Sequence, residues 1–387
     1  MEPLNRIIEK SKHLSFDLNY TYSKQWKSAD TSRILVGYLP IYFPREIVHA
    51  ANGLAVGIFG VGDRKQIIRG DAYYQSYICH LPRGVIEMAL DGSLDKFDGF
   101  VFPAICDCIR NLSGMFKLEQ KGKFQRYFDY PQNFDLSIGG EFYIQEMKHI
   151  IGDMSGINRV QVTDENLIRS IRLFNINRRF IEEIYNIRQE YPWRLSAVET
   201  YYILRAGTSL PVEEHNEILK QVIDHLQNER GEPMDNIRIV VTGSFCEQPP
   251  IGLIKSIEMA GCYIVDDDFM LGSRLIQGNI NSDTGNPLSA LADAYINQSA
   301  FSSCYYDVGN PKGKRLVELV KKRNADGVIF SAASFCDPAL LDRPQMQKEC
   351  DIAGIPHINF QFHENTGQFK VIKEQAGTFS DSIKLWA

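Results

Sequence analysis

The sequence predicts an α/β protein built from two parallel-sheet domains, with a helical leader before the first domain and a helical connector between the two. In both outer parts of the chain, short apolar runs typical of buried strands alternate with segments of helical spacing, which is the pattern of strands that pair in parallel. In the middle of the chain, apolar residues recur at helical spacing over about six turns. The length of 387 residues suits two or three domains.

We expect residues 1–30 to form the helical leader and residues 31–159 the first α/β domain. The run Ile34-Leu35-Val36 is typical of a buried strand, and Pro44 and Pro82 suit the first turns of the helices that follow. The expected strands are 33–39, 54–59 and 98–103, and the expected helices are 45–51, 81–90 and 106–115.

We expect residues 160–230 to form the helical connector and residues 231–387 the second α/β domain. The first helix of the connector begins at Thr163, which is a suitable N-cap. Asp164 and Glu165 follow in its first turn, where acidic side chains interact favourably with the positive end of the helix dipole. The further expected helices are 195–206, 211–228, 251–260, 314–323 and 338–353, and the expected strands are 237–241, 262–265, 327–330 and 357–360.

The composition indicates a globular protein of a reducing compartment. Hydrophobic residues make up 44% of the chain, and the formal net charge of −6 argues against nucleic acid as a partner, because phosphate binding needs clustered Lys and Arg. The N-terminus lacks the apolar core of a signal peptide, and no apolar run is long enough to span a membrane. We therefore expect a cytoplasmic protein whose eight cysteines are not a disulfide framework.

Cys79, Cys106 and Cys336 share one position in the expected fold, because each lies just ahead of a helix. Cys106 and Cys336 also directly follow expected strands, and ligands of α/β sheets bind at the carboxyl ends of strands. Helix N-termini favour the thiolate form, which iron–sulfur clusters require. A shared ligand would lie between the two domains. Buried thiols in tight turns are the simpler alternative, and three scattered thiols without a clear fourth ligand do not resemble a closed zinc site.

The remaining cysteines are less clearly placed. Cys108 competes with Cys106 for the same site, and Cys246 follows an expected strand and is a weaker candidate. Cys262 and Cys350 are expected in the core or at the surface, and Cys304 is not assigned. Glu46 begins a helix after a strand and is expected at the same sheet edge as the three cysteines, although a carboxylate there also simply complements the helix dipole.

Nucleotide-binding motifs are absent from the sequence. No Gly-x-x-x-x-Gly-Lys-Ser/Thr run occurs, so no P-loop is expected. The glycines between Gly53 and Gly62 miss the Gly-x-Gly-x-x-Gly spacing, which disfavours a nicotinamide site.

Several segments together resemble the 2-hydroxyacyl-CoA dehydratase and benzoyl-CoA reductase family. They are Tyr42-Phe43-Pro44-Arg45-Glu46 with the residues up to Ala51, Ser76 to Cys79, Val101 to Asp107, Ser334 to Pro338, Ile257 to Asp268, and Gly354-Ile355-Pro356. The resemblance spans residues 33–387. It implies two Rossmann- or flavodoxin-like domains and one 4Fe–4S cluster on Cys79, Cys106 and Cys336. It favours Cys106 over Cys108 and implies that Glu46 lies near the substrate.

The C-terminal segment is similar to the ATP-dependent reductase branch of this family. Gly367-Gln368 is followed by the residues up to Phe379 without the Thr-Arg pattern of many dehydratases, so the family's C-terminal Arg has no counterpart here. The resemblance implies the reduction of benzoyl-CoA to a cyclic dienoyl-CoA in anaerobic aromatic degradation. A dehydratase subunit that eliminates water through a radical is the alternative, and a scaffold or ligand-binding protein with incidental cysteines is a second one.

The same resemblance implies that this chain works inside a heterotetramer. Its partners would be a homologous iron–sulfur subunit and a pair of ATPase subunits that receive electrons from ferredoxin. ATP would be used by those partners and not by this chain, which agrees with the missing P-loop. No nucleic acid and no membrane are expected as partners.

Overall fold

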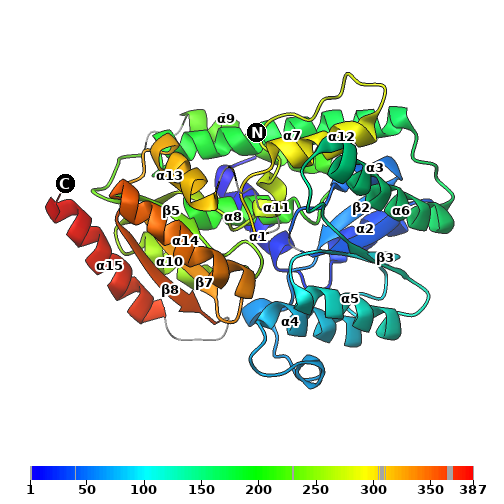
Figure 1. Cartoon of the computed structure of the whole chain (residues 1–387), viewed down its shortest axis with the longest axis horizontal. Helices are drawn as coiled ribbons and strands as arrows, with labels where there is room; N and C mark the ends of the chain where they lie inside the picture. Colours follow the sequence, from blue (N-terminus) through cyan, green and yellow to red (C-terminus); the bar gives the residue numbers. More distant parts are fainter. Residues whose placement is uncertain are drawn as a thin grey trace.

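The computed structural model describes residues 2–39, 41–228, 231–303, 305, 309, 311–363 and 369–386. Cys304 and the pair Gly367-Gln368, which the sequence singled out, lie outside these residues. Figure 1 shows the first half of the chain, blue to cyan, on the right, and the last part, orange to red, on the left. The helices of the connector lie between them and along the top of the view.

The first sheet has four parallel strands in the order β2-β1-β3-β4. Their bounds are Ile34–Tyr38 (β1), Gly53–Gly57 (β2), Gly99–Pro103 (β3) and Phe124–Phe128 (β4). All residues of β1, β2 and β3 are buried, as expected for parallel strands covered on both faces. The helices around this sheet are α3 (Arg45–Ala50), α4 (His80–Leu90), α5 (Asp107–Glu119) and α6 (Glu141–Asn158).

The second sheet repeats the topology of the first, with the order β6-β5-β7-β8. Its strands are Ile237–Thr242 (β5), Cys262–Asp267 (β6), Gly327–Ala333 (β7) and His357–Phe362 (β8). In both sheets the first strand along the chain lies between the second and the third, and the fourth is outermost. The predicted α/β fold with two parallel sheets is therefore confirmed, and each sheet has a switch point between its first and third strands.

Helices cover both faces of the second sheet. Strands β5 and β7 and helices α13 (Lys312–Lys322) and α14 (Asp337–Ala353) contribute to a small apolar core of their own, with Leu316, Val328 and Cys350 among its members. Helices α10 (Ile251–Glu258) and α15 (Phe369–Trp386) pack against one another, and α15 also contacts β5 and β8. The large core is continuous through the first half, the connector and the second sheet.

The connector and the leader are helical, as predicted. The connector helices are α7 (Asp164–Glu190), α8 (Ala197–Ala206) and α9 (Val212–Asn228), and the leader helices are α1 (Leu4–Ser15) and α2 (Thr21–Ser28). Thr163 is the N-cap of α7 and accepts a hydrogen bond from Asn166 N at 3.2 Å. Ser15 Oγ donates to Tyr202 O at 2.8 Å, so the leader packs against the connector. The division of the chain at residues 30, 159 and 230 stays a prediction.

Several elements of the structure were not predicted. They are β4, α6, α11 (Leu271–Arg274), α12 (Pro287–Gln298), α15, two short 3₁₀ turns at Gly62–Arg64 and Gly70–Tyr73, and a π turn at Leu136–Gly140. Helix α12 packs on α6 of the first half, and Tyr295 stacks there on Tyr143 with ring centroids 4.6 Å apart. None of the described helices is long and apolar enough to cross a membrane.

Candidate functional site

A cavity of about 580 Å³ contains the three cysteines that the sequence singled out. Cys79 and Cys106 come from the first half of the chain and Cys336 from the second, so both halves build its wall. Two further cysteines, Cys108 and Cys246, line the same cavity. The structure therefore brings together cysteines that are up to 257 residues apart (336 − 79) in the sequence.

Cys79, Cys106 and Cys336 occupy equivalent places in three helices. Each is the N-cap residue, Cys79 of α4, Cys106 of α5 and Cys336 of α14. The free backbone N–H groups and the helix dipole make such a place favourable for an anion. Three helix N-termini that meet at one cavity favour an anionic group there, although burial and the nearby carboxylate of Glu247 raise the pKa of the Cys79 thiol.

Cys106 and Cys108 differ in how readily they ionise. The hydrogen bond between the two thiols is the largest influence on both, and it lowers the pKa of Cys106 to about 7 while it raises the pKa of Cys108. Backbone N–H groups of Ile109 and Cys108 further favour the Cys106 thiolate. Because thiolates are the metal ligands, this geometry favours Cys106 over Cys108.

The two thiols from the second half are buried in contact with each other. Cys336 and Cys246 are each 4% exposed, and their thiols share a hydrogen bond. This hydrogen bond, followed by burial, raises the pKa of Cys246. Phe335, just before Cys336, has φ +64°, an uncommon left-handed conformation for a residue other than glycine. Such a conformation is held only where the surrounding structure requires it.

Glu247 joins the second half of the chain to the helix that begins at Cys79. Its Oε2 accepts hydrogen bonds from His80 N at 2.9 Å and from Leu81 N at 3.4 Å, and its carboxyl group also hydrogen-bonds to the Cys79 thiol. The side chain is 3% exposed. Burial raises the pKa of Glu247 to about 7, although these hydrogen bonds favour its ionised form.

The donor set suits an iron–sulfur cluster better than a single ion. Among the described residues, no group of three His, Cys, Asp or Glu side chains converges closely enough to hold one metal ion. A zinc ion needs its sulfurs within about 2.3 Å, whereas the ligands of a four-iron cluster lie further apart and bind different irons. Five thiols around one cavity that is shared by three helix N-termini therefore fit a cluster and do not fit a magnesium or calcium site.

Glu46 is not among the residues that line the cysteine cavity. It lies in the first turn of α3, where its Oε1 is 2.7 Å from Arg178 Nη1 of α7. Glu46 is buried, and only 10% of the Arg178 side chain is exposed. The ion pair ties the first domain to the connector, and a place for Glu46 near a substrate stays a prediction.

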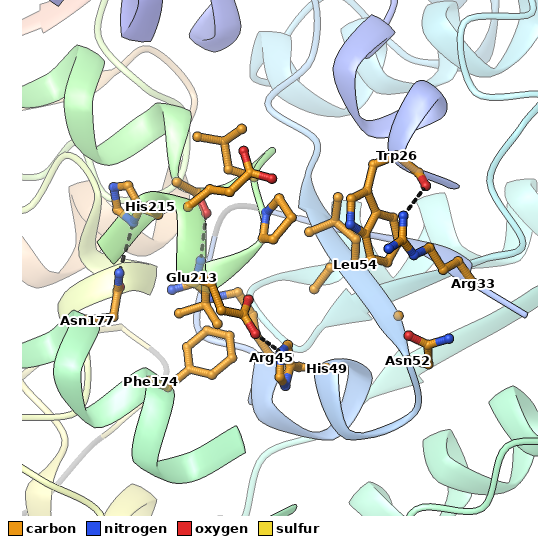
Figure 2. Close-up of a pocket in the computed structure, with 17 residues that line it drawn as sticks. Trp26, Arg33, Arg45, His49, Asn52, Leu54, Phe174, Asn177, Glu213 and His215 are labelled. Carbon is orange, nitrogen blue, oxygen red and sulfur yellow. Dashed lines mark hydrogen bonds and ion pairs between the residues drawn. The ribbon is translucent and has the colours of Figure 1, made fainter. Parts of the chain in front are cut away.

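A second cavity, of about 320 Å³, contains no cysteine (Figure 2). It lies near the amino end of β2 and is lined by residues of α3, α7 and α9. Its ionisable side chains are already paired. His49 Nε2 is 3.0 Å from Glu213 Oε1, and the buried ring of His215 accepts from Asn177 Nδ2 at 3.0 Å, as Figure 2 shows. These contacts hold α9 against its neighbours.

The fold and the cavity define an α/β protein with two parallel sheets and with thiols from both halves of the chain around one cavity. Residues 40–383 match the family described as 2-hydroxyglutaryl-CoA dehydratase, D-component, and the chain belongs to this family. It is 46% identical over 382 residues to a benzoyl-CoA reductase subunit of Thauera aromatica, a match that covers 98% of this chain and 99% of the relative. The predicted likeness to the reductase branch is thereby confirmed.

Dehydratase subunits are more distant relatives. The beta subunit of (R)-phenyllactyl-CoA dehydratase from Clostridium sporogenes is 27% identical, with 91% of this chain and 92% of the relative covered. The beta subunit of lactoyl-CoA dehydratase from Anaerotignum propionicum is 28% identical, with 92% and 93% covered. All three relatives are enzyme subunits, and so is this chain.

Glu247 was not predicted as a residue of the site, and Cys246 was given less weight than the other cysteines. Both belong to the loop that follows β5. The signal that pointed to Cys106 and Cys336, a cysteine just beyond a strand, was also present for Cys246. No local pattern indicates that the carboxylate of Glu247 reaches a helix 167 residues away.

Proposed function

We propose that this chain is the iron–sulfur subunit of an ATP-dependent benzoyl-CoA reductase, an oxidoreductase that converts benzoyl-CoA to cyclohexa-1,5-diene-1-carbonyl-CoA. The observation that carries the proposal is the 46% identity over nearly the full length of a benzoyl-CoA reductase subunit. The thiol-lined cavity supports it, because a one-electron reduction of an aromatic ring needs a redox group. The pathway would be the anaerobic degradation of aromatic compounds.

Cys79, Cys106 and Cys336 are the proposed ligands of one 4Fe–4S cluster. When bound, such a cluster supplies single electrons at a potential that is set by its hydrogen bonds and burial. The chain contributes three helix N-termini that favour the anionic thiolates. The buried positions of Cys79 and Cys336 keep water away from these sulfurs, and the cavity between the halves gives a second group room to approach.

The proposed assembly is a cytoplasmic heterotetramer. It consists of this chain, a homologous iron–sulfur subunit and two ATPase subunits that take electrons from ferredoxin and hydrolyse ATP. The names of the relatives support an enzyme of several subunits. The missing P-loop in this chain agrees with ATP hydrolysis in a partner. Glu46 is proposed to act on the substrate side of the assembly.

A 2-hydroxyacyl-CoA dehydratase subunit is the second candidate function. Its support is the family itself, since the matching family model and two of the relatives described above are those of dehydratases. The difference between 46% and 27–28% identity favours the reductase.

The test is an anaerobic assay of the complete complex, purified from cells that express this chain with its neighbouring subunits. The substrates are benzoyl-CoA with ATP and a low-potential reductant, or a 2-hydroxyacyl-CoA under the same conditions. We expect a dienoyl-CoA by mass spectrometry from benzoyl-CoA and no product without ATP. Water elimination from the 2-hydroxyacyl-CoA, with benzoyl-CoA unchanged, would contradict the proposal and support the dehydratase.

A further inference from the structure

Cys246 lies at the switch point of the second sheet. Strands β5 and β7 are neighbours in this sheet, while their successors β6 and β8 lie on opposite sides. The loops that follow β5 and β7 therefore flank one crevice at the carboxyl ends of the strands. Cys246 is in the first of these loops and Cys336 in the second, so both thiols face the crevice.

The surroundings of Cys246 are those of the cysteines already assigned to the cluster. It lines the same cavity as Cys79, Cys106 and Cys336. It is 4% exposed and shares a hydrogen bond with the Cys336 thiol. Cys108 also lines the cavity, but its side chain is partly exposed whereas that of Cys246 is buried.

The loop that carries Cys246 is held in place by its own hydrogen bonds. Asp268 accepts from Gly243 N at 2.7 Å and from Ser244 N at 3.0 Å, and Ser244 Oγ donates to Ser331 O of β7 at 2.6 Å. Gly243 has φ +108°, and a Cβ there would lie 2.8 Å from Ser331 O. These contacts attach the loop to the neighbouring strand and fix where Cys246 enters the cavity.

We propose that Cys246 is the fourth thiolate ligand of the cluster, an inference that rests on the proposed function of the cavity. The sulfurs of Cys246 and Cys336 cannot stay in hydrogen-bond contact if each of them binds a different iron of the cluster. A change of one side-chain rotamer, a rotation of about 120° about χ1, moves a cysteine sulfur by roughly 3 Å and separates them. As the Cys246 sulfur binds iron, its S–H bond breaks and the proton leaves to solvent, without a change in oxidation state.

A fourth thiolate determines what the cluster of this chain does. A cluster with three thiolates keeps one iron open to water or substrate, whereas a cluster with four has no open iron. This chain then passes electrons to its homologous partner and does not hold the thioester substrate on its own iron.

The inference is tested by controlled oxidation of the full chain after its cluster has been loaded under anaerobic conditions. An open iron is the one most easily lost, and its loss leaves a three-iron cluster with its own EPR signal. We expect wild type to keep its four irons and Cys246→Ser to give the three-iron signal in most of its clusters. Cys350→Ser, which changes a buried thiol outside the cavity, is the matched control and should behave like wild type.

Two results of this experiment would overturn the inference. One is a three-iron signal in wild type as strong as in Cys246→Ser. The other is that signal in Cys108→Ser and not in Cys246→Ser, which would make Cys108 the fourth ligand. Wild type that binds no cluster at all would instead overturn the proposed function, so the two failures can be told apart.

A measurement on wild type alone decides the question if Cys246→Ser does not fold or load. Cyanide binds an open iron and changes the EPR spectrum of a reduced cluster. We expect the spectrum of the loaded wild-type chain to stay the same with cyanide. A cyanide-dependent spectrum would show an open iron and overturn the inference.

Discussion

Replacement of Glu247 by Ala should destabilise the junction between the two halves of the chain. The variant leaves two backbone donors of α4, His80 N and Leu81 N, without their carboxylate acceptor. At a pH well above 7, where Glu247 is ionised, a hydrogen bond to its charged carboxylate contributes about 1.5–3 kcal/mol, and the longer bond of 3.4 Å contributes less. We therefore expect a loss of roughly 3 kcal/mol in the free energy of unfolding, or about 4 °C in Tm for a chain of 387 residues.

The assay is denaturant unfolding of the cluster-free full chain under reducing conditions, combined with hydrogen exchange. The amides of His80 and Leu81 should exchange faster in Glu247→Ala, because these two donors lose their acceptor. Glu87→Ala is the matched control. Glu87 is also a buried carboxylate that accepts three backbone N–H groups, but all of them, at residues 68–70, belong to the first half.

The control should lose stability without faster exchange at residues 80 and 81. Unchanged exchange at these two amides in Glu247→Ala, together with an unchanged unfolding midpoint, would refute the reasoning. Glu247→Gln keeps one acceptor oxygen, so we expect it to recover most of the lost stability, about 2 kcal/mol.

Three further predictions concern Asp268, Gly207 and Glu46. Burial raises the pKa of Asp268 to about 6, so the folded state binds its proton more tightly than the unfolded state does. The free energy of unfolding of wild type should therefore fall by about 2 kcal/mol relative to that of Asp268→Asn as the pH rises from about 4 to 6. Parallel pH profiles of stability in the two proteins would contradict this. In Gly207→Ala the new Cβ would lie 2.2 Å from ring atoms of the buried His215, so thermal unfolding should show a loss of about 2 kcal/mol, whereas an unchanged Tm would mean that the ring can move aside. Glu46→Gln leaves the buried guanidinium of Arg178 without its carboxylate and should lower the free energy of unfolding by about 3 kcal/mol; an unchanged denaturation midpoint would show that the ion pair does not stabilise the fold.

The sequence predicted the strands and helices wherever their pattern is local. The strands β1, β3, β5 and β7 are short runs of buried apolar residues, and such runs can be recognised without knowledge of their neighbours. Strand β4 was missed because four of its five residues are only partly buried. Its sequence, Phe-Gln-Arg-Tyr-Phe, lacks the continuous apolar run that marked the other strands.

The site was predictable to the extent that it follows from chain topology. A cysteine just beyond a strand of a parallel sheet must lie at one edge of that sheet, and this alone placed Cys106 and Cys336. The contacts of Glu46 and Glu247 were not predictable, because their partners lie 132 and 167 residues away in the sequence. Contacts of that kind depend on how the two halves and the connector pack together, which no local pattern encodes.

The most direct test of the central claim, one cluster shared by both halves of the chain, is the iron content of Cys→Ser variants. Wild type, loaded under anaerobic conditions, should contain about four irons and four sulfides per chain and show the EPR signal of a reduced cluster. The double variant Cys246→Ser/Cys336→Ser, which removes both thiols that the second half contributes to the cavity, should lose most of this iron, while Cys262→Ser, at the start of β6, should keep it. A double variant with full iron content and an unchanged signal would contradict the claim.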